Sequence, residues 1–183
     1  PEAIAKLEHA VALNPNLGSV HGNLGIALFQ SKQPVAAIAH LEIARKAEPG
    51  LPLVHANLAL ALAERDGFSA GLESIAQAIR LEPKSAKFHT IAAGLARGAN
   101  RLQLAILHYR TAIGLGDRSV ANLNDLAWLL ANGSESGASA EAVALAQEAV
   151  ESSHPPGAEV LDTLAVACAA AGRWREAIEN ATQ

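Results

Sequence analysis

The seven histidines are the residues in this sequence that most invite a chemical role, because imidazole is a common metal ligand and general base. Three of them, His21, His55 and His89, lie at a constant interval of 34 residues. A constant interval of this length is typical of stacked helical repeats, in which equivalent positions are separated by about 10 Å. Zinc, in contrast, needs each ligand nitrogen about 2.0–2.1 Å away. One ion therefore cannot bridge this column, and we interpret the three rings as packing residues.

The remaining candidates for chemistry carry no recognisable motif. His40 and His108 form a second column that we expect at the solvated surface, while His9 and His154 follow no pattern. The single cysteine, Cys168, lies in the apolar phrase LAVACAAAG and is interpreted as a buried, inert thiol. The sequence contains no HExxH, GxGxxG or GxxxxGK[ST] motif. It therefore predicts no enzyme activity, no cofactor and no metal site.

Composition narrows the class of protein further. Half of the 183 residues are apolar, which is ample for a buried core, but only 3% are aromatic. A net charge of −4 lacks the positive surplus that binding to a nucleic acid backbone requires. No apolar run reaches the roughly 18 residues of a membrane span, and the amino end shows no signal pattern. We predict a chain that neither binds nucleic acid nor inserts into membranes, with the cytoplasm favoured and the periplasm left open.

Proline exposes an internal repeat. Pro15, Pro49 and Pro83 are spaced 34 residues apart and close three similar phrases, AVALNP, ARKAEP and AIRLEP. Apolar residues within each unit recur at steps of three and four, which is typical of helices and excludes strands. Small residues also form columns on this period, and these columns include Ala37, Gly71 and Ala105 as well as Ala44, Ala78 and Ala112. Small side chains allow two helices to approach closely, so each unit is predicted to be a helical hairpin.

These phrases resemble the tetratricopeptide repeat (TPR) family, whose 34-residue pattern is W-x2-L-G-x2-Y, then A-x3-F, then P. The first full unit matches it through His21, Leu24, Gly25, Leu28, Ala37, Leu41 and Pro49. The resemblance implies an all-α protein, an α-solenoid in which tandem helix-turn-helix repeats form a right-handed superhelix. The related pentatricopeptide repeats bind RNA, but the acidic balance and the terminal proline argue against them.

The repeat period divides residues 1–183 into a single solenoid fragment. Its predicted parts are a second helix over 1–17, repeats over 18–51, 52–85 and 86–119, a longer repeat over 120–157 with an extended loop between its helices, and a truncated repeat over 158–183. Since both ends fall within second helices without polar caps, we expect a piece of a longer protein. The uncapped end faces would also permit end-to-end self-association.

Binding is the function that the repeats favour, because first helices line the inner surface of such a solenoid. The phrases VHGNLG and VHANLA are similar to repeats of O-linked N-acetylglucosamine transferase, in which groove asparagines hold peptide backbone. That resemblance implies the same role for Asn23 and Asn57, and extends it to Asn124 and Asp125. The alternative is an ordinary surface asparagine bonded to water or to the preceding helical turn.

Other positions complete the predicted peptide-binding groove, namely Ile26, Leu60, Lys87 and Trp128. Trp128 is either an exposed interface anchor or a core residue, and Trp174 is interpreted as packing. A clamp for a terminal carboxylate is not expected, because Gly22, Ala56 and Thr90 stand where lysines would be needed. We predict a non-catalytic module that binds an extended peptide or a partner helix. The alternative is the substrate-recruiting region of a larger transferase, and the alanine-rich phrases suggest a bacterial origin.

Overall fold

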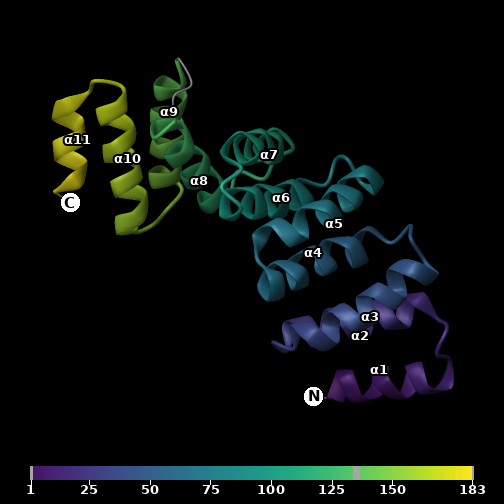
Figure 1. Ribbon diagram of the computed structural model, residues 1–183. Coiled ribbons are helices and arrows are strands. Elements are labelled where there is room, and N and C mark those ends of the chain that lie inside the picture. Colours follow the sequence, from purple (N-terminus) through teal and green to yellow (C-terminus); the bar gives the residue numbers. More distant parts are fainter. Residues whose placement is uncertain (1, 134–136, 183) are drawn as a thin grey trace. The chain divides into compact units, whose positions relative to one another are not determined.

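The structure is a computed structural model that describes residues 2–133 and 137–182. Over these residues the chain forms eleven α-helices and no strand, which confirms the predicted all-α fold (Figure 1). The helices are α1 (Glu2–Leu13), α2 (Gly18–Gln30), α3 (Pro34–Ala47), α4 (Pro52–Asp66), α5 (Phe68–Leu81), α6 (Ala86–Gly98), α7 (Leu102–Gly114), α8 (Val120–Ala131), α9 (Ala138–Glu151), α10 (Ala158–Ala170) and α11 (Trp174–Ala181).

Proline and glycine determine where several helices begin and end. Pro34 and Pro52 open α3 and α4, at positions where the missing N–H costs no helical hydrogen bond. Gly67 is the one residue between α4 and α5, and Gly172 lies in the turn between α10 and α11. Their φ angles are +93° and +73°, in the region that only glycine adopts without steric cost. Short turns therefore force consecutive helices into antiparallel hairpins.

The hairpins pack through small residues. Helix α2 packs on α3 and α4 packs on α5, while α8 packs on α9 and α10 packs on α11. Ala37 and Ala44 are fully buried. A Cβ atom added to Gly71 would lie 2.4 Å from the backbone oxygen of Ala59 on the neighbouring helix. The columns of alanine and glycine thus have the close-packing role predicted from the sequence.

The described chain divides between Arg101 and Leu102 into two compact units. Unit 1 contains α1–α6 and unit 2 contains α7–α11. In unit 1 one apolar cluster joins α2, α3 and α4 around Leu24, Leu41 and Leu58, and a second joins α4, α5 and α6 around Ile75 and Phe88. Helix α4 therefore buries side chains in both clusters, against α2 and α3 on one side and against α5 and α6 on the other.

The right-handed superhelix and the repeat boundaries remain predictions. Within the predicted longer repeat over 120–157, α8 ends at Ala131 and α9 begins at Ala138, after a left-handed glycine at position 137. The centre of the loop predicted between these helices, residues 134–136, lies outside the described part of the chain.

Candidate interaction surfaces

The helices that begin each predicted repeat contact one another within each unit. In unit 1, α2 contacts α4 and α4 contacts α6, whereas among the described residues no comparable contact joins α3 and α5. In unit 2, α8 contacts α10. Successive first helices therefore lie closer together than the second helices in unit 1. We define the inner face of unit 1 as the less buried side of α2, α4 and α6, and the inner face of unit 2 as that of α8 and α10.

Asn23 and Asn57, the pair predicted to bind peptide backbone and called the asparagine ladder from here on, lie on the inner face of unit 1. They differ in burial and in hydrogen bonding. Asn23 is exposed, and its amide makes no hydrogen bond to another described residue. Asn57 is half-buried, and its Nδ2 donates to the backbone oxygen of Leu53, one turn earlier, at 2.8 Å. Asn23 therefore keeps its full hydrogen-bonding capacity, while Asn57 keeps its Oδ1 as an acceptor.

Apolar and basic residues surround this pair. Ile26 and Leu60 are half-buried, and Ile26 also packs against the cluster of α2, α3 and α4. Lys87 is exposed on α6, and the half-buried Ile91 takes the position that asparagine holds in α2 and α4. The asparagine ladder in unit 1 is therefore two residues long.

The inner face of unit 2 differs in its polar residues. The hydroxyl of Tyr109 on α7, itself buried, donates to Oδ2 of Asp125 at 2.6 Å. Asp125 is thus engaged within the protein, which the repeat pattern did not reveal. The Oδ1 atom of its neighbour Asn124 is buried and has no hydrogen-bond partner. An unpaired acceptor of this kind costs free energy until a donor reaches it.

Trp128 is an exposed residue of the unit 2 inner face, not a core residue. Its side chain is 47% exposed on α8, and Val166 on α10 is 38% exposed. Of the two interpretations of Trp128, the structure favours the exposed one. Trp174 was interpreted wrongly, because it is 66% exposed at the start of α11. That helix buries Ala177 and leaves both Trp174 and Ile178 in contact with solvent.

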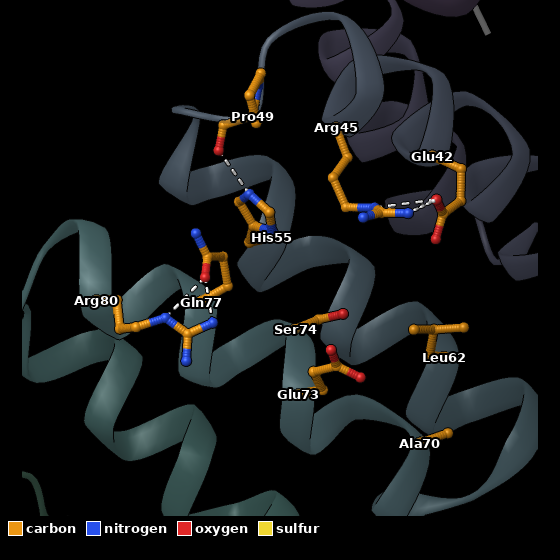
Figure 2. Close-up of a pocket in the computed structure, with 10 residues that line it drawn as sticks. All are labelled: Glu42, Arg45, Pro49, His55, Leu62, Ala70, Glu73, Ser74, Gln77 and Arg80. Carbon is orange, nitrogen blue, oxygen red and sulfur yellow. Dashed lines mark hydrogen bonds and ion pairs between the residues drawn. The ribbon is translucent and has the colours of Figure 1, made fainter.

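The column of His21, His55 and His89 has a clear structural role. All three rings are buried, and each Nε2 donates to the carbonyl oxygen of the proline six residues earlier. The distances are 3.0 Å for His21, 2.8 Å for His55 and 3.1 Å for His89; Figure 2 shows the bond between His55 and Pro49. A carbonyl oxygen can only accept, so Nε2 must carry the proton. Each ring therefore fastens the turn between two repeats to the helix that follows it.

His40 corrects a sequence prediction, because it is half-buried and not fully solvated. Its Nδ1 lies 2.9 Å from Nδ1 of His21, and the two ring centroids are 5.1 Å apart. His21 already carries its proton on Nε2, so neutral His40 must be the donor in this pair. The signal available in the sequence was the separation of 19 residues, which recurs between His89 and His108. His108 is half-buried as well.

We expect the His21–His40 pair to make folding pH-dependent. Burial lowers the pKa of His40 in the folded state, the neighbouring His21 lowers it further, and Glu8 opposes the shift. The unfolded chain therefore binds more protons just below the ordinary histidine pKa of about 6.5. The contribution of neutral His40 to the free energy of unfolding is therefore fully present above the ordinary histidine pKa. It is lost as the pH falls through that value towards the lower pKa of the folded state.

The measurement is the urea midpoint between pH 7.5 and pH 5. Replacing His40 with glutamine should flatten this dependence, whereas replacing His9, which is exposed on α1, should leave it unchanged. Identical pH profiles for the wild type and His40→Gln would show that the pair does not couple protonation to folding.

Cys168 is buried, and burial raises the pKa of its thiol, which makes the reactive thiolate scarcer. Within residues 2–133 and 137–182, no three His, Cys, Asp or Glu side chains gather closely enough to hold a metal ion. None of the described helices has both the length and the apolar character needed to cross a bilayer.

Tandem antiparallel helical pairs, with small residues at their contacts, define an all-α helical-repeat protein. A sequence model of the tetratricopeptide repeat family matches residues 56–120. The fold as a whole is similar to YrrB, described as a TPR protein with an unusual peptide-binding site, at 15% identity and a TM-score of 0.84. That match covers 95% of this chain and 88% of YrrB.

Structures of MamA are also similar. MamA from Desulfovibrio magneticus RS-1 matches at 15% identity and a TM-score of 0.77, covering 90% of this chain and 91% of that one. MamA AMB-1 matches at 19% identity and a TM-score of 0.75, covering 87% and 92%. A search of curated proteins gave no match. At these identities the likenesses show the fold, and the finer resemblance to transferase repeats remains a prediction.

Proposed function

We propose that this chain is a non-catalytic scaffold that holds an extended peptide or a partner helix against the inner faces of its first helices. The observation that carries the proposal is the state of Asn23. This residue is exposed on the repeated inner face, and neither its donor nor its acceptor is used within the described chain.

The chemistry of this face suits a polypeptide. An amide side chain matches the N–H and C=O groups of a peptide backbone without reading the sequence of the ligand. Asn23 offers both kinds of group, and Asn57 offers its oxygen and one N–H, because its other N–H already bonds Leu53. The apolar surface of Ile26 and Leu60 lies one helical turn further along the same two helices. Peptide side chains would bury against that surface.

Unit 2 would contribute a different kind of contact. Tryptophan is enriched among the residues that dominate binding energy. Trp128 is nearly half exposed on the inner face of unit 2. The unpartnered oxygen of Asn124 on the same helix is buried, so it would accept a hydrogen bond from a bound group only after neighbouring side chains move. The proposal does not require an acidic or basic ligand, because Asp125 is already bonded to Tyr109.

We expect the double replacement Asn23→Ala and Asn57→Ala to weaken peptide binding about tenfold. Each net hydrogen bond contributes about 0.5–1.5 kcal/mol, and a tenfold change corresponds to about 1.4 kcal/mol. The probe is a peptide selected from a random displayed library on the wild-type chain and labelled for fluorescence anisotropy. Helicity and melting temperature should stay nearly unchanged.

The matched control is Asn16→Ala, which removes an exposed asparagine from the turn before α2. It should bind the peptide as the wild type does. The peptide must be one whose binding shifts the amide resonances of α2 and α4. If the double variant bound such a peptide as tightly as the control does, the proposed role of Asn23 and Asn57 would be wrong.

A further inference from the structure

The outer side of unit 1 contains a polar pocket that the inner-face proposal does not use. Its volume is about 390 Å³, within the range of roughly 300–1,000 Å³ typical of ligand pockets. Helix α3 contributes Glu42 and Arg45, α5 contributes Glu73 and Arg80, and His55 of α4 lies between them (Figure 2). The pocket lies where α3 and α5 both pack on α4 but, among the described residues, make no comparable contact with each other.

The corresponding space in unit 2 is bridged. There, Arg110 of α7 makes a bidentate ion pair with Glu141 of α9, with distances of 3.0 Å and 2.6 Å. Alignment of the buried columns places Glu42 of α3 at the position of Arg110, and Ala70 of α5 at the position of Glu141. An alanine cannot form the bridge, so the space between α3 and α5 stays open.

A second bridge is missing in the same way. Arg118, in the turn after α7, pairs with Glu148 of α9. The same positions in unit 1 are held by Gly50 and Gln77, which cannot form an ion pair. Side chains of the pocket instead bond along their own helices: Arg45 pairs with Glu42 at 2.6 Å, and Nε of Arg80 donates to Gln77 at 2.8 Å. Unit 1 thus has neither of the two ion pairs that close the corresponding space in unit 2.

The pocket has one positive and one negative charge without a compensating partner. The charge of Arg45 is balanced by Glu42, but the guanidinium of Arg80 bonds only the neutral amide of Gln77. Glu73 is exposed and makes no ion pair with another described residue. These two uncompensated residues are seven positions apart on α5, which corresponds to about 10.5 Å along the helix.

We propose that this outer pocket binds an extended peptide segment of a partner protein that carries a basic and an acidic side chain three residues apart. A polyproline II segment rises about 3.1 Å per residue with three residues per turn, so such side chains share one face about 9 Å apart. The basic group pairs with Glu73 and the acidic group with Arg80. Between them, the half-buried Ser74 lines the pocket and offers its hydroxyl to the peptide backbone, while the buried His55 forms part of the pocket wall.

The test is an NMR titration of the whole chain with blocked peptides. The first probe is Ac-Gly-Pro-Lys-Ala-Pro-Glu-Gly-NH2, and the second replaces its lysine with glutamate. The wild type should bind the first probe more tightly, with resonance shifts on α3 and α5. Glu73→Arg should weaken that binding by roughly three- to tenfold, because it replaces an exposed attraction worth up to about 1 kcal/mol with repulsion. The same variant should bind the second probe more tightly than the wild type does.

The matched control is Glu151→Arg, which makes the same change in net charge on an exposed residue of unit 2. It should not alter the preference between the probes. An equal effect of both variants, or shifts confined to α2 and the inner side of α4, would overturn the proposal. The double variant Asn23→Ala and Asn57→Ala should leave these titrations unchanged, so the outer pocket and the inner-face proposal fail or survive independently.

Discussion

Replacing Phe88 with alanine should lower the free energy of unfolding by about 3–5 kcal/mol, the largest change expected from any substitution considered for this chain. Phe88 is 2% exposed and belongs to the apolar cluster that joins α4, α5 and α6. Among the described residues, Phe88 is the only aromatic residue in this cluster, and four of its other buried members are alanines, alongside Ile75 and Leu95. An alanine cannot extend into the cavity that the replacement would leave, so relaxation offsets only part of the loss.

The measurement is urea denaturation followed by circular dichroism, with Phe68→Ala as the control. Phe68 is the same residue type at the start of α5, but 52% of its side chain is exposed. Its replacement should cost about 1 kcal/mol, because much less apolar surface leaves a buried environment. Similar losses for the two variants would mean that the cluster around Phe88 does not stabilise unit 1.

Gly71→Ala should have the second largest effect, a loss of about 1–3 kcal/mol, although alanine is the better helix former. The added Cβ would lie 2.4 Å from the backbone oxygen of Ala59 and 3.0 Å from a methyl group of Leu95. A backbone atom cannot move aside as a flexible side chain can. Helices α4 and α5 must therefore separate, and contacts along the whole hairpin weaken.

Gly94→Ala is the matched control for this steric argument. Gly94 lies within α6, and a Cβ added there meets no heavy atom within 4 Å. Alanine should then stabilise the helix by about 0.5–1 kcal/mol. The melting temperatures of the two variants should move in opposite directions, by several degrees downward for Gly71→Ala and a few degrees upward for Gly94→Ala. A rise in both would show that the close approach of α4 and α5 is not limiting.

The fold was predictable because each repeat must satisfy the same packing constraints, so the same residue types recur at the repeat period. Pro15, Pro49 and Pro83 set the period, and the small residue at position 71 recurs in character at 37 and 105 because each hairpin needs the same close approach. The packing role of the histidine column followed from this logic too. Its bond to the preceding proline carbonyl did not, since a sequence column records spacing and not the direction in which a ring points.

The details that escaped prediction are contacts that occur once. Tyr109 reaches Asp125 and Arg110 reaches Glu141, pairs set by side-chain rotamers and by charges that the other repeats do not share. The outer pocket was missed for a related reason, because it arises where Ala70 replaces a bridging acid. Sequence periodicity finds what repeats have in common, whereas these features depend on how one repeat departs from the others.

The bonds from imidazole to prolyl carbonyl also decide where the chain can be shortened. A truncated chain that starts at Gly18, the first residue of α2, would leave Nε2 of His21 buried without its acceptor on Pro15. One that starts before Pro15 would keep the bond. The same holds for Pro49 with His55 and for Pro83 with His89. A shortened chain should therefore begin at or before Pro15, Pro49 or Pro83, several residues upstream of the first residue of α2, α4 or α6.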